Sequence, residues 1–529
     1  MRDLHLPGRS AVRSARAMAA SSQPSSTLAA IEILQAGGNA MDAAIAACAV
    51  QCVTEPGSTG IGGDCFCLYQ PAGADAPVAF NGSGKAAGKS DMAFFQERGI
   101  TALDDESAHV VTIPGAIDAW AALSADHGRL GLDRILQPAI CYAEEGFAVH
   151  GRTATDFAGA SAKLSKDEGA KAIYFNVAGK VPVEGDILRQ PALAATLRRI
   201  AIEGRSAFYE GAVAEDIVAT LNAKGGGHAI ADFDAAGGGY VTPIKTNFRG
   251  YDVFECPPNG VGVIALLMLN LTQSMPISGD PMSPDRLHRM IEATRLAYRD
   301  RNAFVGDSNF SDVPVETLLS QDYANALAAN IDDKQAAKLL PPPGLPRHDD
   351  TVYISVVDGD GNACSFINSL FKGFGSGIVA AKSGIVLQNR GFGFVLEDGH
   401  PNCIAPGKRP MHTIIPGMLC KSGRAVMPFG VMGGHYQPVG HNWLLSSMLD
   451  HGLDPQEAMD LPRIFAYENQ VEIENGVSDA VAVDLTARGH NVKRVSGPHG
   501  GSQGIWIDHE RGTLAGGSDP RKDGCAIGF

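Results

Sequence analysis

The chain has 529 residues, 45% of them hydrophobic, which allows a large core and exceeds the usual domain size of roughly 100–200 residues. Its 58 acidic and 43 basic side chains give a net charge of −15 with no basic stripe, which argues against nucleic acid or an anionic membrane as a partner. The ten cysteines are scattered without a C-x-x-C pair, as expected of reduced thiols. A small molecule is therefore the expected partner.

The N-terminal segment, MRDLHLPGRSAVRSARAMAASS, carries arginines but no continuous apolar stretch. No later segment approaches the ~20 apolar residues that are needed to span a bilayer. These two features predict a cytoplasmic protein with no membrane partner.

The first hundred residues predict a pair of helices followed by a sheet. Apolar residues recur at helical spacing over residues 27–36, two glycines end the run, and Asn39 is placed to cap a second helix that extends to Val50. A glycine-rich loop at residues 57–63 then leads directly into a strand over residues 64–70. A dinucleotide-binding fingerprint needs a helix after such a loop, so this order argues against one.

The middle of the chain predicts helices, and the last third predicts strands. Apolar faces at three- and four-residue spacing mark helices over residues 115–128, 133–147 and 283–304. Residues 332–350 contain four prolines and many charges and read as an exposed connector. Strands are then expected over residues 351–358, 362–369, 384–391, 413–420, 425–432, 504–508 and 513–517, with a helix near residues 442–452.

Thr351 follows the proline-rich connector and two aspartates, and it opens a predicted strand. This arrangement is expected if Thr351 Oγ attacks the carbonyl of Asp350 and the resulting ester is hydrolysed. The new α-amino group, with a pKa near 7.7–8, would then serve as the base for the adjacent hydroxyl. The alternative interpretation is that Thr351 is only a β-branched residue in a strand.

Motifs along nearly the whole chain resemble one family. They include GGNAMDAAIAACAVQCVTEPGSTGIGGD, EATRLAYRDRNAFVGD, DTVYISVVDGDGNACS, MGGH and GGSDPRKDG, in this order. The chain is thereby similar to the γ-glutamyltransferase (glutathione hydrolase) family of N-terminal nucleophile hydrolases. The resemblance implies an α+β fold, a four-layer αββα sandwich. It also implies a precursor that is cut into associated chains 1–350 and 351–529, and a homodimer of these heterodimers is a further expectation.

The resemblance assigns catalytic roles to four residues of this sequence. Thr351 matches the nucleophile, and Ser369 falls where the family has a hydroxyl residue that supports it. Gly433 and Gly434 match the glycine pair whose backbone N–H groups form the oxyanion hole, a role that glycines suit because they let a carbonyl approach closely. The alternative for this pair is an ordinary tight turn. No metal and no cofactor are expected.

The sequence departs from the family where the polar contacts to a glutamyl head group are expected. The family's arginine, aspartate, glutamine, serine pair and asparagine correspond here to Ser83, Gly393, Arg390, His412 with Thr413, and Phe371. A site that hydrogen-bonds the polar groups of its substrate typically gains selectivity on the order of 10⁴–10⁵ from those contacts. Because this chain lacks the residues that would hold a glutamyl head group, glutathione is not expected to be a good substrate.

The replacements predict a different clamp for an anion. Arg390 can hold a carboxylate with two hydrogen bonds, His412 can donate one, and Phe371 fills space that a glutamyl chain would use. Asn389 and Thr413, with Ser83, complete the expected substrate pocket. This pattern resembles the branch that includes oxamate amidohydrolase and favours a small carboxylate-bearing amide, best oxamate. The alternatives are a structural ion pair for Arg390 and a buried, hydrogen-bonded histidine for His412.

Other functions are alternatives to this one. A γ-glutamyltransferase acting on γ-glutamyl compounds is the first alternative, and an uncleaved, non-enzymatic family member is the second. The G-x-S-x-G motif around Ser502 would need a helix after the serine, whereas the following residues alternate as a strand. The pairs His435 with His441 and His400 with Cys403 lack the ligand spacing of a zinc hydrolase.

Overall fold

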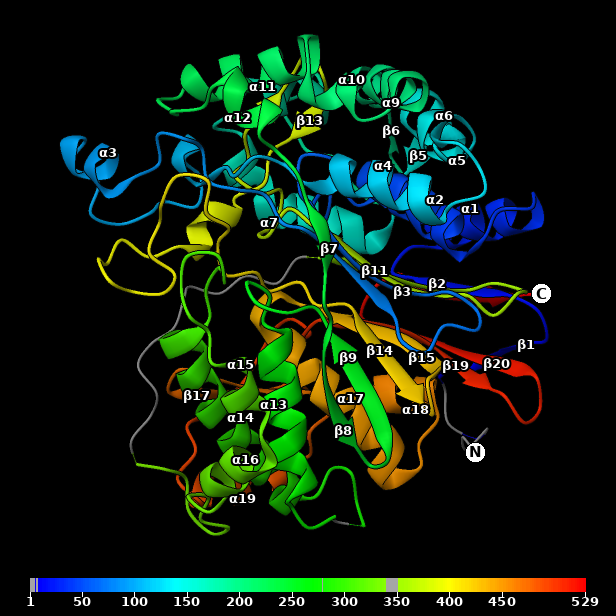
Figure 1. The fold of residues 1–529 in the computed structure, drawn as a ribbon, viewed down its shortest axis with the longest axis vertical. Coiled ribbons are helices and arrows are strands. Elements are labelled where there is room, and N and C mark those ends of the chain that lie inside the picture. The colour runs from blue at the N-terminus through cyan, green and yellow to red at the C-terminus, as the bar shows by residue number, and fades with distance from the viewer. Residues whose placement is uncertain (1–4, 6–7, 278, 339–350) are drawn as a thin grey trace.

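The computed structural model describes residue 5 and residues 8–277, 279–338 and 351–529, and Figure 1 shows their arrangement. Two sheets lie face to face in the middle of the molecule, with helices above one and below the other (Figure 1). This is the predicted four-layer αββα sandwich, and the fold class is confirmed.

The first sheet has seven strands, all paired antiparallel. In spatial order they are β1 (Val12–Ser14), β20 (Thr513–Ser518), β19 (Gly501–Asp508), β15 (Arg424–Met432), β14 (Gly417–Lys421), β9 (Tyr251–Glu255) and β8 (Ile244–Phe248). The second sheet is also antiparallel. Its order is β21 (Cys525–Gly528), β2 (Met18–Ser21), β10 (Val352–Val357), β11 (Ala363–Ser369), β3 (Asp64–Gln70), β4 (Val78–Gly82) and β7 (Gly239–Val241).

Helices cover the outer face of each sheet (Figure 1). The layer over the second sheet contains α1 (Pro24–Gln35), α2 (Ala40–Thr54), α4 (Ala116–His127), α6 (Gln137–Glu145), α7 (Gly151–Leu164), α9 (Pro191–Glu203) and α11 (Ala212–Asn222). The layer under the first sheet contains α13 (Gly262–Gln273), α14 (Pro284–Phe304), α15 (Val315–Leu319), α16 (Gln321–Ala328), α17 (Gln437–His451) and α18 (Pro455–Asp460). Beside α14 lie α19 (Asp479–Ala487) and a small sheet of β16 (Ile464–Tyr467), β17 (Gln470–Ile473) and β18 (Val492–Arg494).

Three apolar cores hold the layers together. One lies between α1, α2 and their neighbours and the second sheet, and another between α13, α17 and the first sheet. The third fills the space between the two sheets with residues such as Phe66, Tyr353 and Met418. Alternating side chains of each strand therefore face two different cores, which explains why strands such as β10 and β11 are buried along their whole length.

Most predicted elements are present, with shifted ends. Asn39 caps α2 and the glycine loop leads into β3, both as expected, and the cap is a capping box with Asp42. The strand expected at residues 413–420 begins only at Gly417, and that expected at residues 384–391 is reduced to β13 (Ile385–Val386). Among the described residues, no helix combines the length and apolarity that a membrane crossing requires.

Candidate active site

Thr351 lies just before β10, at the edge of the inter-sheet core. Val352 pairs with Asn368 across the antiparallel ladder, so the next step of the register places Thr351 opposite Ser369. The Thr351 side chain is buried, with 1% of its surface exposed, and its Oγ1 lies 3.2 Å from Ser369 Oγ. The pairing of β10 with β11 thus brings two hydroxyl groups together, which the family resemblance predicts as nucleophile and supporting residue.

Gln437 provides a further contact to Thr351 that the sequence analysis missed. Its Nε2 lies 3.4 Å from Thr351 Oγ1, and its Oε1 accepts a hydrogen bond of 3.0 Å from the backbone N–H of Ile415. The second bond fixes the orientation of the amide. Gln437 is the first residue of α17 and follows the Gly433–Gly434 turn by three positions, which is the signal that could have marked it.

Ser369 Oγ connects Thr351 with the predicted anion clamp. Phe371 donates its backbone N–H to this oxygen at 2.9 Å, and Arg390 donates a guanidinium N–H at 3.2 Å. Because two N–H groups already donate to Ser369 Oγ, its own O–H is a donor in this cluster, and Thr351 Oγ1 is an acceptor within reach. The oxygen of Ser369 therefore links the guanidinium of Arg390 to the hydroxyl of Thr351.

Arg390 is a fully buried cation. Its Nη1 donates to Thr413 Oγ1 at 2.9 Å, and the guanidinium lies 4.2 Å from the centre of the Phe371 ring, in a cation–π arrangement. Within the described part of the chain no carboxylate lies within salt-bridge distance, and Nε has no hydrogen-bond partner. The alternative role of Arg390, a structural ion pair, therefore lacks a carboxylate partner among the described residues. Burial lowers the pKa of Arg390 to about 9, with Asp64 acting in the opposite direction.

Phe371 has a backbone conformation that is rare for a residue with a side chain. Its φ is +86°, in the left-handed region that L residues seldom occupy, and its N–H is held by Ser369 Oγ. This conformation places the ring over the guanidinium of Arg390. The turn after β11 thus stores local strain at the point where the hydroxyl cluster meets the cation.

His412 is a buried histidine that pairs with Asp64. Its Nε2 lies 3.0 Å from Asp64 Oδ2, and its Nδ1 accepts from the backbone N–H of Ile414 at 3.4 Å. Burial and the charge of Arg390 lower the pKa of His412 to about 3, so the ring is neutral. Both ring nitrogens have partners within the protein, which agrees with the alternative of a buried, hydrogen-bonded histidine. Donation from His412 to a substrate stays a prediction.

Two other predicted pocket residues hold neighbouring loops. The amide of Asn389 accepts from the backbone N–H of Lys372 at 3.1 Å and donates to the carbonyl of Asp105 at 2.9 Å. Ser83 Oγ accepts from Asn259 Nδ2 at 3.1 Å. Their assignment to the substrate pocket stays a prediction. Asp350, the predicted residue before the cleavage point, lies outside the described residues.

The Gly433–Gly434 turn follows β15 and precedes α17. Both glycines have positive φ, +115° and +54°, and a Cβ on Gly433 would lie 2.7 Å from Gly500 Cα. On one side of the turn Gly430 packs against the ring of Tyr353, and on the other Gln437 reaches Thr351 Oγ1. The turn therefore lies between a residue that packs on β10 and a residue that contacts Thr351, and its role as an oxyanion hole stays a prediction.

The Ser502 alternative does not fit the structure. Ser502 lies within β19, so no helix follows it, and its Oγ accepts a hydrogen bond of 2.8 Å from Arg463. The strand-to-helix turn of a nucleophile elbow is absent at this position.

Comparison with known proteins identifies the family. The model of the family described as "Gamma-glutamyltranspeptidase" matches residues 26–529. The chain belongs to the gamma-glutamyltranspeptidase family. It is therefore an enzyme of this family, an amidohydrolase with the N-terminal nucleophile hydrolase fold.

Three proteins are similar to this chain over almost its whole length. The glutathione hydrolase-like YwrD proenzyme of Bacillus subtilis is 37% identical over 94% of this chain and 95% of its own length. The oxamate amidohydrolase proenzyme of Klebsiella pneumoniae is 33% identical over 94% and 96%. The crystal structure of a cephalosporin acylase from Bacillus halodurans, 39% identical, covers 100% of this chain and 98% of its own, with a TM-score of 0.93. Two of these relatives are named as proenzymes, which fits a cleaved, two-chain gamma-glutamyltranspeptidase-family enzyme acting on small molecules.

Proposed function

We propose that this enzyme cleaves itself before Thr351 and then hydrolyses a small amide that carries a carboxylate next to the scissile carbonyl. The best candidate is oxamate, which would yield oxalate and ammonia. One observation carries the proposal: the buried guanidinium of Arg390 has no carboxylate partner among the described residues and shares Ser369 as a direct neighbour with Thr351. A substrate carboxylate would supply the missing counterion at a short distance from the nucleophile.

The proposed reaction uses the groups around Thr351. The α-amino group released by cleavage takes the Oγ1 proton as Oγ1 attacks the amide carbonyl, and the N–H groups of the Gly433–Gly434 turn stabilise the oxyanion. The leaving nitrogen takes that proton and departs as ammonia, which leaves an ester on Thr351. Water, deprotonated by the same amino group, then attacks the ester carbonyl; the bond between that carbon and Oγ1 breaks, the proton returns to Oγ1 and oxalate leaves. The O–H of Ser369 orients Oγ1 throughout.

The short path from Arg390 to Thr351 favours a short substrate. In oxamate the carboxylate is bonded directly to the amide carbonyl, whereas in a γ-glutamyl compound three further carbons separate the α-carboxylate from the scissile carbonyl. Arg390 and Thr351 both contact the single oxygen of Ser369, which leaves little distance between anion and nucleophile. The relative from Klebsiella pneumoniae, named an oxamate amidohydrolase, supports this substrate class.

The names of other relatives supply the competing functions. One is a glutathione hydrolase-like proenzyme, and the cephalosporin acylase covers the full chain with a TM-score of 0.93. The test is a substrate panel with purified, cleaved protein: oxamate, oxamide, a γ-glutamyl anilide and a cephalosporin amide. Turnover is measured as ammonia released from oxamate and oxamide, as aniline released from the anilide and as side-chain acid released from the cephalosporin amide, and we expect it to be fastest with oxamate. Efficient turnover of the anilide or the cephalosporin, with no activity on oxamate, would contradict the proposal and assign the chain to the corresponding alternative.

A further inference from the structure

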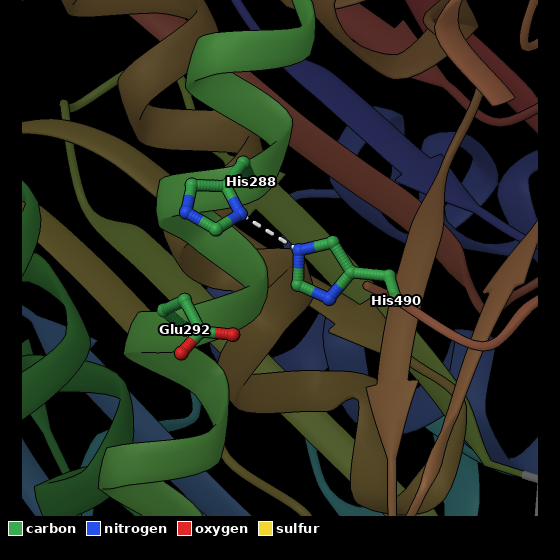
Figure 2. A group of neighbouring side chains, drawn as sticks. All are labelled: His288, Glu292 and His490. Atoms are coloured by element: carbon green, nitrogen blue, oxygen red, sulfur yellow. Dashed lines mark hydrogen bonds between the residues drawn. The ribbon is translucent and has the colours of Figure 1, made fainter. Parts of the chain in front are cut away.

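A second group of polar side chains lies buried in the helical layer under the first sheet (Figure 2). His288 and Glu292 are four residues apart on α14 and therefore project from the same face of the helix. His490 reaches them from the segment between α19 and β18. One nitrogen or oxygen atom from each of the three lies within 4.8 Å of the others.

The hydrogen bonds of His288 leave one of its nitrogens as a lone-pair donor. Its Nε2 lies 2.7 Å from the backbone carbonyl oxygen of Asp332, which can only accept, so Nε2 carries the hydrogen. Its Nδ1 is then unprotonated in the neutral ring and faces His490 Nε2 at 2.7 Å. A histidine that ligates a metal donates its other ring N–H to a carbonyl or carboxylate in the same way.

His490 is not held in one tautomer by a second contact. Its Nδ1 is buried and has no hydrogen-bond partner in the described part of the chain. The ring therefore has either a hydrogen on Nε2, donated to His288, or a hydrogen on Nδ1 and a lone pair on Nε2. In the second form both facing nitrogens are ligands. A tetrahedral ion with bonds of about 2.0–2.1 Å needs them roughly 3.3 Å apart, which a small rotation of His490 would provide.

Glu292 completes the set of three donors. Its Oε1 accepts from Arg295 at 2.8 Å and its Oε2 from the backbone N–H of Ala337 at 3.1 Å, so each oxygen keeps a further lone pair. Two imidazole nitrogens and one carboxylate oxygen are a donor set that suits Zn²⁺ and similar divalent transition ions. The charge of Arg295 opposes a cation here and should reduce the affinity.

We propose that His288, Glu292 and His490 bind one divalent transition-metal ion of the Zn²⁺ class, in place of the hydrogen bond between the two imidazoles. The site is structural and separate from the Thr351 chemistry. It joins three segments: α14, the segment that carries His490, and residues 332–338. The last segment is held through the Asp332 carbonyl and the Ala337 N–H, which bind the ligands His288 and Glu292.

Titration with Co²⁺ tests the site directly. The protein should be untagged and carry Cys141→Ser, because Cys141 is an exposed thiol that could bind metal. We expect one equivalent of bound Co²⁺ with a visible absorption band that Zn²⁺ removes. His490→Gln should weaken binding at least about tenfold, since even partners of ligands typically contribute that much. His509→Gln, which removes an exposed histidine, is the matched control and should bind as the parent does.

A third variant tests the position of the ion beside Glu292. Arg295→Met removes the opposing charge with a side chain of similar length and should tighten Co²⁺ binding. Circular dichroism and amidase activity establish that each variant is folded. The proposal is overturned if the folded parent binds no stoichiometric Co²⁺, if His490→Gln binds as tightly as the parent, or if Arg295→Met fails to raise the affinity.

Discussion

At the scale of single residues, Arg390 determines the proposed substrate class. A buried guanidinium without a counterion is costly, and here two hydroxyl groups and an aromatic ring contact it instead of a carboxylate. A buried guanidinium of this kind is suited to bind a ligand that supplies the missing negative charge. The strained backbone of Phe371 and the interaction of its ring with the guanidinium fit a site that is organised before the ligand arrives.

Replacing Arg390 by methionine is expected to separate catalysis from maturation. Loss of one buried, charged hydrogen-bond partner should cost about 2–4 kcal/mol in kcat/KM for oxamate, on the order of 30- to 1000-fold. Cleavage before Thr351 should persist because it involves no free carboxylate substrate. Arg390→Lys keeps the charge but not the planar fork, so it should retain part of the activity. Steady-state kinetics measure the loss of activity, and a denaturing gel shows whether the chain is cut. An equal loss of kcat/KM for oxamate and oxamide would contradict the assignment of Arg390 to the substrate carboxylate.

The pH dependence of kcat/KM for oxamate should reflect the protonation of two groups. The α-amino group of Thr351, with a pKa near 7.7–8, must be neutral, so activity rises as the pH passes through about 8. Arg390 must be charged to hold an anion, and because its pKa is lowered to about 9, kcat/KM for oxamate should fall above that pH. Neutral oxamide does not need this charge. Its profile should therefore lack the alkaline fall, and a shared fall would assign it to another group.

Thr351 is predicted to carry out both self-cleavage and turnover. Thr351→Ala should give one uncut chain of 55.3 kDa without hydrolase activity, because both steps use the same Oγ1. Thr351→Ser keeps a hydroxyl and should still be cut. Mass spectrometry of the mature small chain is the measurement. A first residue other than Thr351 would overturn the assignment of the nucleophile.

The sequence predicts site residues whose neighbours along the chain form a recognisable pattern. It does not predict residues whose role depends on contacts with distant parts of the chain. Thr351 stands out because a connector, two aspartates and a strand surround it. Gln437 and Asp64 do not, because their partners Thr351 and His412 are 86 and 348 positions away. The partner of His412 could not be predicted for the same reason, because a buried, hydrogen-bonded ring and a substrate-binding ring cannot be distinguished until Asp64 is placed beside it.

At the scale of elements, the Gly433–Gly434 turn links β15 to α17, whose first residue, Gln437, contacts Thr351. Gly433→Ala should move the backbone, because its Cβ would lie 2.7 Å from Gly500 Cα. If the turn forms the oxyanion hole, kcat should fall on the order of 10²–10³-fold. Gly452→Ala is a matched control, since Gly452 has φ +66° but nothing within 4 Å of its Cβ. It should lose about 1 kcal/mol of stability with kcat unchanged. Similar kcat values for the two variants would argue against the oxyanion role.

Element ends were predicted less well than elements, for a reason visible before β14. The N–H of Ile414 donates to the His412 ring, and that of Ile415 donates to Gln437 Oε1. Pro416 has no N–H. Residues 414–416 therefore have no N–H donors left for a strand ladder, although isoleucine side chains favour one. Strand propensity describes the side chains of a segment, whereas here the side chains of His412 and Gln437 accept the backbone N–H groups that a strand ladder would use.

At the scale of the whole molecule, cleavage before Thr351 would divide both sheets between two chains. In the second sheet, β10 and β11 of the predicted small chain lie between β2 and β3 of the large chain. In the first sheet, β20 pairs with β1 and β14 pairs with β9, again across the two chains. Neither predicted chain has a complete sheet of its own, and the core between the sheets draws residues from both.

The two chains are therefore expected to stay together after cleavage and to unfold as one unit. Separation would break the β2–β10 and β3–β11 ladders and expose the inter-sheet core to water, which hydrophobic burial strongly opposes. Size-exclusion chromatography under native conditions should give a single peak that resolves into two bands on a denaturing gel. The uncut Thr351→Ala variant should elute at the same volume, and calorimetry of cut protein should show one transition. Release of either chain without denaturant would contradict this interlocked arrangement of strands.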